Sequence, residues 1–242
     1  MFPLKDNIPT LRFPVVTVAL IVANFIVYFL FQQGLLGLPD GGNGGEWPVP
    51  TYAEIPCELT GADPCRTAPG GPPTLLTVLT AMFMHGSILH IGGNMLFLWI
   101  FGNNVEDSMG PVKFLLFYLL SGIAAAALQL AIDPGSQIPN LGASGAVAGV
   151  LGGYLLLFPR ARVVTVIFII FFFTILELPA MLFLGVWILQ QVLFGYFDLN
   201  SAGDTGGVAY FAHIGGFAFG LLAIKLFADE RKRRDQIDRV GF

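Results

Sequence analysis

The stretch GASGAVAGVLGGYLLLF (residues 142–158) decides the fold, because it is apolar and glycine-rich over the length of a helix and carries no charged side chain. Ser144 stands near its start, and His213 stands near the start of a second apolar, glycine-rich stretch, residues 208–228. A histidine at membrane depth is costly unless it has a partner or a task. A serine with small neighbours is a natural partner, so we expect the two residues to meet.

The composition is that of a polytopic membrane protein. Hydrophobic residues make up 55% of the 242 residues and charged residues only 12%, whereas soluble domains carry about a quarter charged residues. This excludes a soluble α/β-hydrolase, and nothing in the sequence indicates a nucleic-acid partner. The N-terminus lacks the basic start and small-residue cleavage site of a signal peptide, so the first apolar stretch is expected to be retained.

Hydropathy predicts an all-α bundle of six transmembrane helices in a single membrane domain, residues 1–242, because a bilayer core needs about 20 mainly apolar residues per helix. The expected outer loop is residues 34–73, and the expected basic cytoplasmic tail is residues 229–242. Residues 163–176 are too short to span before Glu177, so we expect an interfacial or protein-buried segment there. The spans are expected near residues 14–33, 84–102, 112–132, 143–158, 177–197 and 208–228.

The positions of the basic residues favour this count. With a cytoplasmic N-terminus and six spans, 11 of the 12 basic residues fall on the cytoplasmic side and only Arg66 falls outside, as the positive-inside rule requires. A separate span at 163–176 would move the Arg-rich tail outside. Both termini are therefore expected in the cytoplasm. The cluster at residues 231–234 suits an anionic inner leaflet, or it is simply a stop signal.

Three of the predicted spans bring polar residues to one depth below the outer surface. Ser144 and His213 lie on the fourth and sixth spans. His90 and Asn94 lie on the second span and, four residues apart, share one helical face. Any one of them could be a packing hydrogen bond, but four at matched depth favour a reaction centre. Glycines at four-residue spacing let helices approach closely in lipid; they are Gly145, Gly149 and Gly153 on the fourth span, and Gly216 and Gly220 on the sixth.

These blocks resemble those of the rhomboid intramembrane serine proteases. The resemblance covers about residues 75–225 and implies a six-span, bacterial-type member in the bacterial plasma membrane, with its active site open to the outer side. Segments 83–90 and 102–106 are also similar to the family's region around its second span. The blocks that carry the resemblance are Gly142-Ala143-Ser144-Gly145, Ala212-His213-x-x-Gly216-x-x-x-Gly220 and His90-x-x-x-Asn94.

The resemblance implies a role for each of these residues. Ser144 would be the nucleophile and His213 the general base of a dyad that has no acidic third member. The backbone N–H of Ser144, with His90 and Asn94, would line the oxyanion hole. Substrates would be transmembrane helices of single-span or polytopic membrane proteins, cleaved near the outer face through an acyl-enzyme. No cofactor is implied, the oligomeric state stays open, and His85 is expected to be structural.

Two positions depart from the family pattern. Leu76-Thr77 stand where many members carry Trp-Arg before the second span, which puts the anchoring of that loop in doubt. Ala148 stands where several members carry an aromatic residue that stacks on the histidine. The orientation of His213 is therefore left to other residues.

The two cysteines, Cys57 and Cys65, fall in the predicted outer loop, on the oxidising side of the membrane. A disulfide is expected there, with unpaired thiols as the alternative. Because the chain has three histidines and its cysteines lie in a different loop, no metal site is expected.

Two other classes of function stay open. A catalytically inactive rhomboid-like protein that binds transmembrane clients would be expected to lack the serine or the histidine, and both are present. A small-solute transporter usually carries charged or broken helices at mid-depth, and intramembrane charge is nearly absent here.

Overall fold

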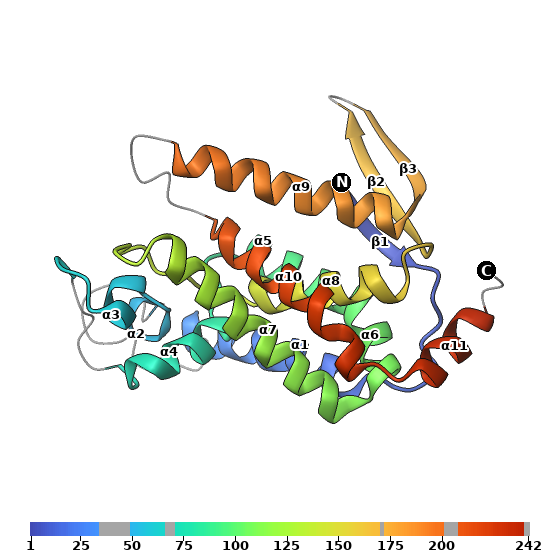
Figure 1. The fold of residues 1–242 in the computed structure, drawn as a ribbon, viewed down its shortest axis with the longest axis horizontal. Coiled ribbons are helices and arrows are strands. Elements are labelled where there is room, and N and C mark those ends of the chain that lie inside the picture. Colours follow the sequence, from blue (N-terminus) through green and yellow to red (C-terminus); the bar gives the residue numbers. More distant parts are fainter. Residues whose placement is uncertain (34–48, 66–70, 170–171, 201–207, 240–242) are drawn as a thin grey trace.

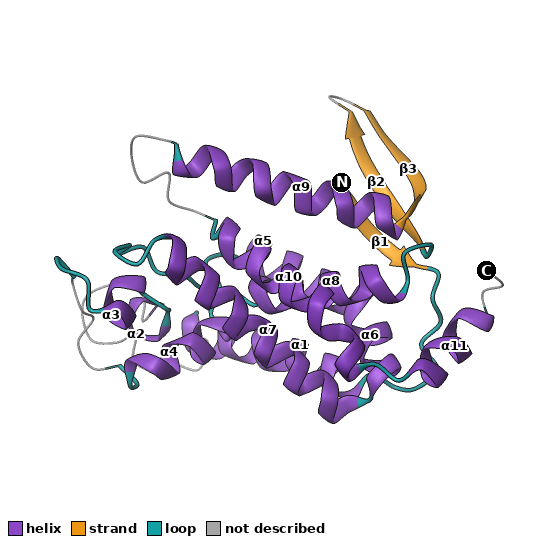
Figure 2. Ribbon diagram, viewed as in Figure 1, coloured by secondary structure: helices purple, strands orange, loops and turns teal. Residues whose placement is uncertain are grey.

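Long apolar helices build the fold, in agreement with the hydropathy of the chain (Figures 1 and 2). The computed structural model describes residues 1–33, 49–65, 71–169, 172–200 and 208–239. Within these ranges, four helices are long and apolar enough to cross a membrane. They are α1 (Val15–Ile26) with its π-helical continuation η1 (Val27–Gln32), α7 (Pro111–Ile132), α9 (Ala180–Leu199) and α10 (Tyr210–Phe227).

Two further apolar segments are shorter or bent. The helix α8 (Ser144–Leu157) has 14 residues, and the chain that precedes α7 forms two helical segments bent by 81°. The protein is therefore a mostly helical integral membrane protein, and the count of six spans stays a prediction. The parts of the bent pair are α4 (Thr74–Thr80), η2 (Ala81–Phe83), α5 (Ile88–Phe97), the π-helical η3 (Leu98–Gly102) and α6 (Asn103–Met109).

The glycine-rich helix α8 lies at the centre of the bundle. Its residues from Gly145 to Tyr154 are all buried, and it packs on α10 and α7. The closest approach is between backbones: a Cβ atom on Gly220 would lie 1.9 Å from the carbonyl oxygen of Gly149. One on Gly216 would lie 2.0 Å from the carbonyl oxygen of Gly145. The four-residue glycine spacing thus sets the contact between α8 and α10, as it does for close helix pairs in lipid.

The fold is mostly helical rather than all-α, because residues 163–169 and 172–176 belong to a β-sheet. The strand β2 (Arg162–Ile169) pairs antiparallel with β3 (Phe172–Pro179) and with the N-terminal strand β1 (Phe2–Asp6). Val, Ile, Thr and Phe are residue types that favour strands. Hydropathy alone could not indicate the pairing of β1 with β2, since β1 lies far away in the sequence. The sheet takes residues 177–179, so α9 begins at Ala180.

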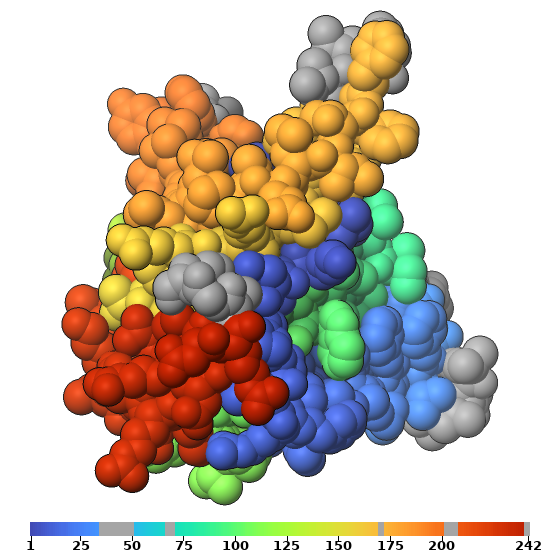
Figure 3. All heavy atoms as spheres, turned by 90° about the vertical axis from the view of Figure 1, so that its right-hand side faces the viewer, coloured from blue at the N-terminus to red at the C-terminus, as the bar shows by residue number. Residues whose placement is uncertain are grey.

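The hairpin β2–β3 is buried only near its base. Val163 and Thr165 are fully buried, whereas Phe168, Phe172 and Phe173 are mostly exposed. Figure 3 shows this hairpin projecting beyond the helices. The expected interfacial or protein-buried segment is thus a hairpin, buried at one end. The sheet and α11 (Glu230–Asp238) lie toward one end of the bundle, and α2–α4 lie toward the other (Figure 1).

Carboxylates of α6 hold the N-terminal segment against the bundle. Glu106 accepts hydrogen bonds from the backbone N–H groups of Val16 (2.9 Å) and Thr17 (2.7 Å), in the first turn of α1. Asp107 accepts one from the backbone N–H of Leu11 at 2.6 Å. A carboxylate at this end of a helix satisfies free N–H groups and suits the helix dipole. Segment 102–106 therefore contributes to the anchoring of the first span.

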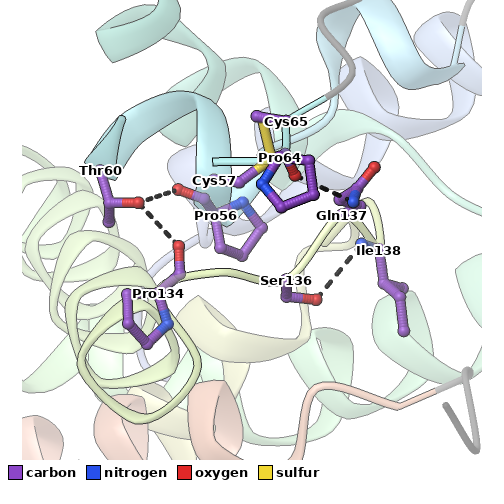
Figure 4. The surroundings of a disulfide bond; sticks show 9 residues. All are labelled: Pro56, Cys57, Thr60, Pro64, Cys65, Pro134, Ser136, Gln137 and Ile138. Carbon is purple, nitrogen blue, oxygen red and sulfur yellow. Dashed lines mark hydrogen bonds between the residues drawn. A yellow bond between two sulfur atoms is a disulfide. The ribbon is translucent and has the colours of Figure 1, made fainter. Parts of the chain in front are cut away.

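The expected outer loop is folded where it is described. It contains α2 (Val49–Tyr52), α3 (Pro56–Thr60) and a disulfide between Cys57 and Cys65, whose Cα atoms lie 5.6 Å apart. The hydroxyl of Thr60 donates to the carbonyl of Pro134 at 2.7 Å (Figure 4). The loop thus holds the segment that leads from α7 to Ser144. Residues 34–48 and 66–70 of the expected loop, with Arg66, lie outside the described residues, as do residues 240–242 of the tail.

Glu54 links this loop to the chain before α8. Its backbone forms a β-bridge with Asn140, with N···O distances of 3.0 and 2.7 Å. Its side chain is buried, with one carboxyl oxygen unpaired. This burial raises the pKa of Glu54 from 4.5 to about 7. Since the folded state holds the proton more tightly, stability is highest below about pH 4.5 and falls as the pH rises to about 7.

We therefore expect Glu54→Gln to remove a pH dependence of stability. Relative to this variant, the wild type should lose about 3 kcal/mol at most between pH 4.5 and 7, and nothing further above that range. The measurement is thermal unfolding in detergent over this range. Glu58→Gln is the matched control, because it makes the same chemical change at a partly exposed position of the same loop. Parallel curves for wild type and Glu54→Gln would contradict the expectation.

Candidate active site

The structure brings Ser144 and His213 together. Ser144 is the first residue of α8, and His213 lies in the first turn of α10. The Oγ atom of Ser144 lies 2.8 Å from Nε2 of His213. This distance is within the range for a serine and its general base. The glycine contacts between α8 and α10 hold the two helix ends at this separation.

Two residues of α9 lie against the imidazole of His213. Nδ1 of His213 lies 2.9 Å from Oε1 of Gln191, a buried side chain. The ring centroids of Trp187 and His213 lie 5.9 Å apart, and the two ring planes are inclined by 38°. Gln191 and Trp187 therefore orient His213 where Ala148 supplies no aromatic ring. Neither residue was predicted from the sequence, although two adjacent glutamines in an otherwise apolar span indicate a polar contact.

His90 and Asn94 lie on α5 and face the same pocket as the dyad. The pocket has a volume of about 260 Å³, and Trp187 also lines it. Apart from these polar groups, its walls are apolar side chains of α5 and α8, which are Leu89, Phe97, Val147, Ala148 and Leu151. All four polar residues expected to form the reaction centre thus line one cavity.

Gly142 lets the chain before α8 approach α5. Its φ angle is +122°, which disfavours any side chain. A Cβ atom there would lie 2.7 Å from Nε2 of His90 and 3.5 Å from Nδ2 of Asn94. Glycine therefore brings the backbone of Ala143 and Ser144 close to both side chains. The first N–H groups of α8 have no helical partner, so they are free to bind a negative charge.

His85 lies behind Asn94. Its Nε2 is 3.0 Å from Nδ2 of Asn94 and 3.5 Å from the backbone N of Ala143. Both partners are N–H donors, so Nε2 of His85 is an acceptor. One of the two N–H groups of Asn94 is thus occupied, and the other is free for a ligand. Gln32 bonds the backbone N–H and C=O of His85, each at 2.9 Å. These contacts agree with a structural role for His85.

The loop that departs from the family pattern is helical. Leu76 and Thr77 lie in α4, where Leu76 is about half exposed. Thr77 is buried, and its hydroxyl donates to the carbonyl of Thr74 at 2.6 Å.

Among the described residues, no group of three His, Cys, Asp or Glu side chains could hold a metal ion.

Comparison with known proteins identifies the family. The Rhomboid domain model matches residues 72–230, more than half of the chain. The chain belongs to the rhomboid family. It is 30% identical over 169 residues to "Rhomboid protein 1, mitochondrial" of Saccharomyces cerevisiae, which covers 66% of this chain and 45% of the relative. It is 26% identical over 180 residues to "Presenilin-associated rhomboid-like protein, mitochondrial" of Homo sapiens, covering 72% and 42%.

A plant protein, "RHOMBOID-like protein 4" of Arabidopsis thaliana, is 35% identical over 145 residues, covering 60% of this rhomboid chain and 32% of the relative. The chain thus spans less than half the length of these curated relatives. All three relatives are eukaryotic, so they do not support the bacterial type expected from the sequence. The membrane in which this rhomboid protein resides stays a prediction.

Proposed function

We propose that this protein is an intramembrane serine endopeptidase that cleaves transmembrane helices of other membrane proteins near their outer ends. The observation that carries the proposal is the 2.8 Å contact between Ser144 Oγ and His213 Nε2, within a cavity that His90 and Asn94 also line. Membership of the rhomboid family supports it. The reaction is peptide-bond hydrolysis in two steps.

In the first step, Ser144 Oγ attacks the carbonyl carbon of the scissile bond while its proton passes to His213 Nε2. The new C–O bond gives a tetrahedral intermediate with a negative oxygen. When the C–N bond breaks, the imidazolium returns the proton to the leaving amine, and an acyl-enzyme remains. In the second step, water attacks the ester carbon and gives its proton to Nε2. The ester bond to Oγ breaks, Oγ regains a proton, and the new carboxyl end is released.

The negative oxygen of the intermediate needs fixed donors. The Ser144 N–H stands at the start of α8, where the helix dipole favours negative charge. The free N–H of Asn94 and a ring N–H of His90 complete the set. Each such donor typically contributes about 3–4 kcal/mol of transition-state stabilisation.

The length of α8 supports a site below the outer surface. Its 14 residues rise about 21 Å, less than the roughly 30 Å hydrocarbon core. A helix that ends at the cytoplasmic face therefore begins below the outer face, with Ser144 at that level. The proposed topology has six spans, which are the four long helices, α8 and the bent pair counted as one span. Both termini are then cytoplasmic. The mostly apolar pocket suits an unwound segment of a single-span or polytopic substrate.

The test uses purified protein and a labelled model transmembrane substrate in proteoliposomes. We expect cleavage at one main bond near the outer end of the substrate, mapped by mass spectrometry. A fluorophosphonate should label Ser144 and block cleavage. Labelling of Ser144 should be lost in His213→Ala, because the base is missing. If the substrate stays intact and the fluorophosphonate labels a residue other than Ser144, the proposal is contradicted. That result would favour a non-catalytic protein that binds transmembrane clients.

A further inference from the structure

The buried amide of Gln191 approaches the dyad from a helix that supplies none of the proposed reacting groups. Oε1 of Gln191 lies 2.9 Å from Nδ1 of His213, on the opposite side of the ring from Ser144. We propose that Gln191 is a positioning residue that fixes the tautomer of His213 and makes the dyad depend on the seating of α9. This inference rests on the proposed function.

The orientation of the Gln191 amide follows from its second contact. Nε2 of Gln191 lies 3.4 Å from the carbonyl oxygen of Trp187, one turn earlier in α9. An amide nitrogen only donates, so Nε2 faces that carbonyl and Oε1 faces His213. Because Oε1 only accepts, Nδ1 must carry the proton. Nε2 of the ring is then free to accept the proton of Ser144.

A neutral amide suits this position in a membrane. A carboxylate would also hold Nδ1–H, as in soluble serine proteases, but an ionised group within the bilayer costs several kcal/mol. The amide supplies the acceptor without the charge. The cost is a weaker stabilisation of the imidazolium that forms during attack, since a neutral acceptor interacts less strongly with a cation.

The contact also links two helices. Most side chains of α9 face outward, and its buried residues are Ala180, Phe183, Leu184, Gln191 and Gly195. Gln191 is the polar one among them. An outward shift of α9 by about 1 Å lengthens the bond to His213 beyond hydrogen-bonding range. The proton on Nδ1 then loses its partner, and the reactive tautomer is no longer enforced.

Gln191→Leu tests the role by removing the acceptor at similar volume. We expect kcat to fall about 10- to 100-fold, the loss typical of residues that orient a metal-bound histidine through its other ring nitrogen, with KM within about two-fold of the wild type. Gln190→Leu is the matched control, because it makes the same change at the neighbouring, exposed position of α9. It should keep wild-type kinetics.

Gln191→Glu separates positioning from packing. It keeps an acceptor at the same reach, and pairing with the imidazolium offsets the cost of burying its charge, so the carboxylate stabilises the protonated imidazole. The acid limb of the pH–rate profile should therefore move to higher pH by about one unit. A residue that only packs would not move this limb. A profile that superposes on the wild type, with Gln191→Leu as active as Gln190→Leu, would overturn the inference.

A second readout needs no substrate. In protein labelled with ¹⁵N-histidine, the resonances of His213, assigned by their loss in His213→Ala, should report a protonated Nδ1 and an unprotonated Nε2. Gln191→Leu should shift them toward a mixture of tautomers. A wild-type His213 protonated at Nε2 overturns the inference even if cleavage occurs. An Nδ1-protonated ring that depends on Gln191 supports it even if the proposed protease activity fails.

Discussion

Replacing Ser144 with alanine should abolish cleavage of a transmembrane substrate. Loss of a serine nucleophile lowers kcat by about 10⁴-fold or more, because no covalent intermediate can form. The variant should still fold, since the change removes one oxygen at the start of α8 and leaves the glycine contacts with α10 intact. The measurement is the initial rate of cleavage of a labelled substrate in proteoliposomes, with binding of the intact substrate followed in parallel.

Ser121→Ala is the matched control for this experiment. Ser121 is a buried serine of α7, and its hydroxyl donates to the carbonyl of Phe117 at 2.7 Å. The same chemical change is thus made in the same bundle, away from His213. This variant should cleave at a rate near that of the wild type. Equal cleavage by Ser144→Ala and Ser121→Ala would show that Ser144 is not the nucleophile.

Gly220→Ala should cause the largest loss of stability among single-methyl changes. The added Cβ would lie 1.9 Å from the carbonyl oxygen of Gly149 and 3.0 Å from its Cα. These are backbone atoms, so no rotamer change can relieve the overlap and α8 and α10 must separate. Overpacking of a rigid core usually costs about 1–3 kcal/mol, occasionally more. We expect a loss of about 3 kcal/mol, measured by unfolding in mixed micelles.

The same separation should reduce activity, because Ser144 and His213 are carried by these two helices. Gly185→Ala is the control, since a Cβ atom at Gly185 meets nothing within 4 Å. Alanine in a helix interior is favoured over glycine by up to about 1 kcal/mol, so this variant should be as stable as the wild type or more so. If Gly220→Ala proves as stable to unfolding as Gly185→Ala, the close contact between α8 and α10 does not determine the stability of the bundle.

The long helices follow from hydropathy because each is determined by its own composition. A span must satisfy its backbone hydrogen bonds internally, so an apolar segment of sufficient length has one solution. The helices near residues 14–33, 112–132 and 208–228 accordingly lie close to their expected positions. The sheet was not predicted, because hydropathy does not distinguish a short apolar strand from a buried helical segment, and because the pairing of β1 with β2 joins residues far apart in the chain.

The four polar residues of the candidate site could be singled out from the sequence, because a polar side chain in an apolar span needs a reason. Gln191 carried the same signal, but two glutamines stand side by side, and only the rotation of α9 determines which one faces inward. The contacts of His85 and Gly142 likewise depend on tertiary packing, which places Nε2 of His85 beside Asn94 and Gly142 beside His90.

The sequence by itself determined that this chain is a helical membrane protein, and it singled out Ser144 and His213, since both conclusions depend on local composition and on short motifs. The tertiary structure decided which groups meet. The 2.8 Å contact of Ser144 with His213, and the 2.9 Å contact of His213 with Gln191, depend on how far apart three helices pack and how each is rotated. Those quantities arise from side-chain volumes summed over whole interfaces, and no single segment carries them.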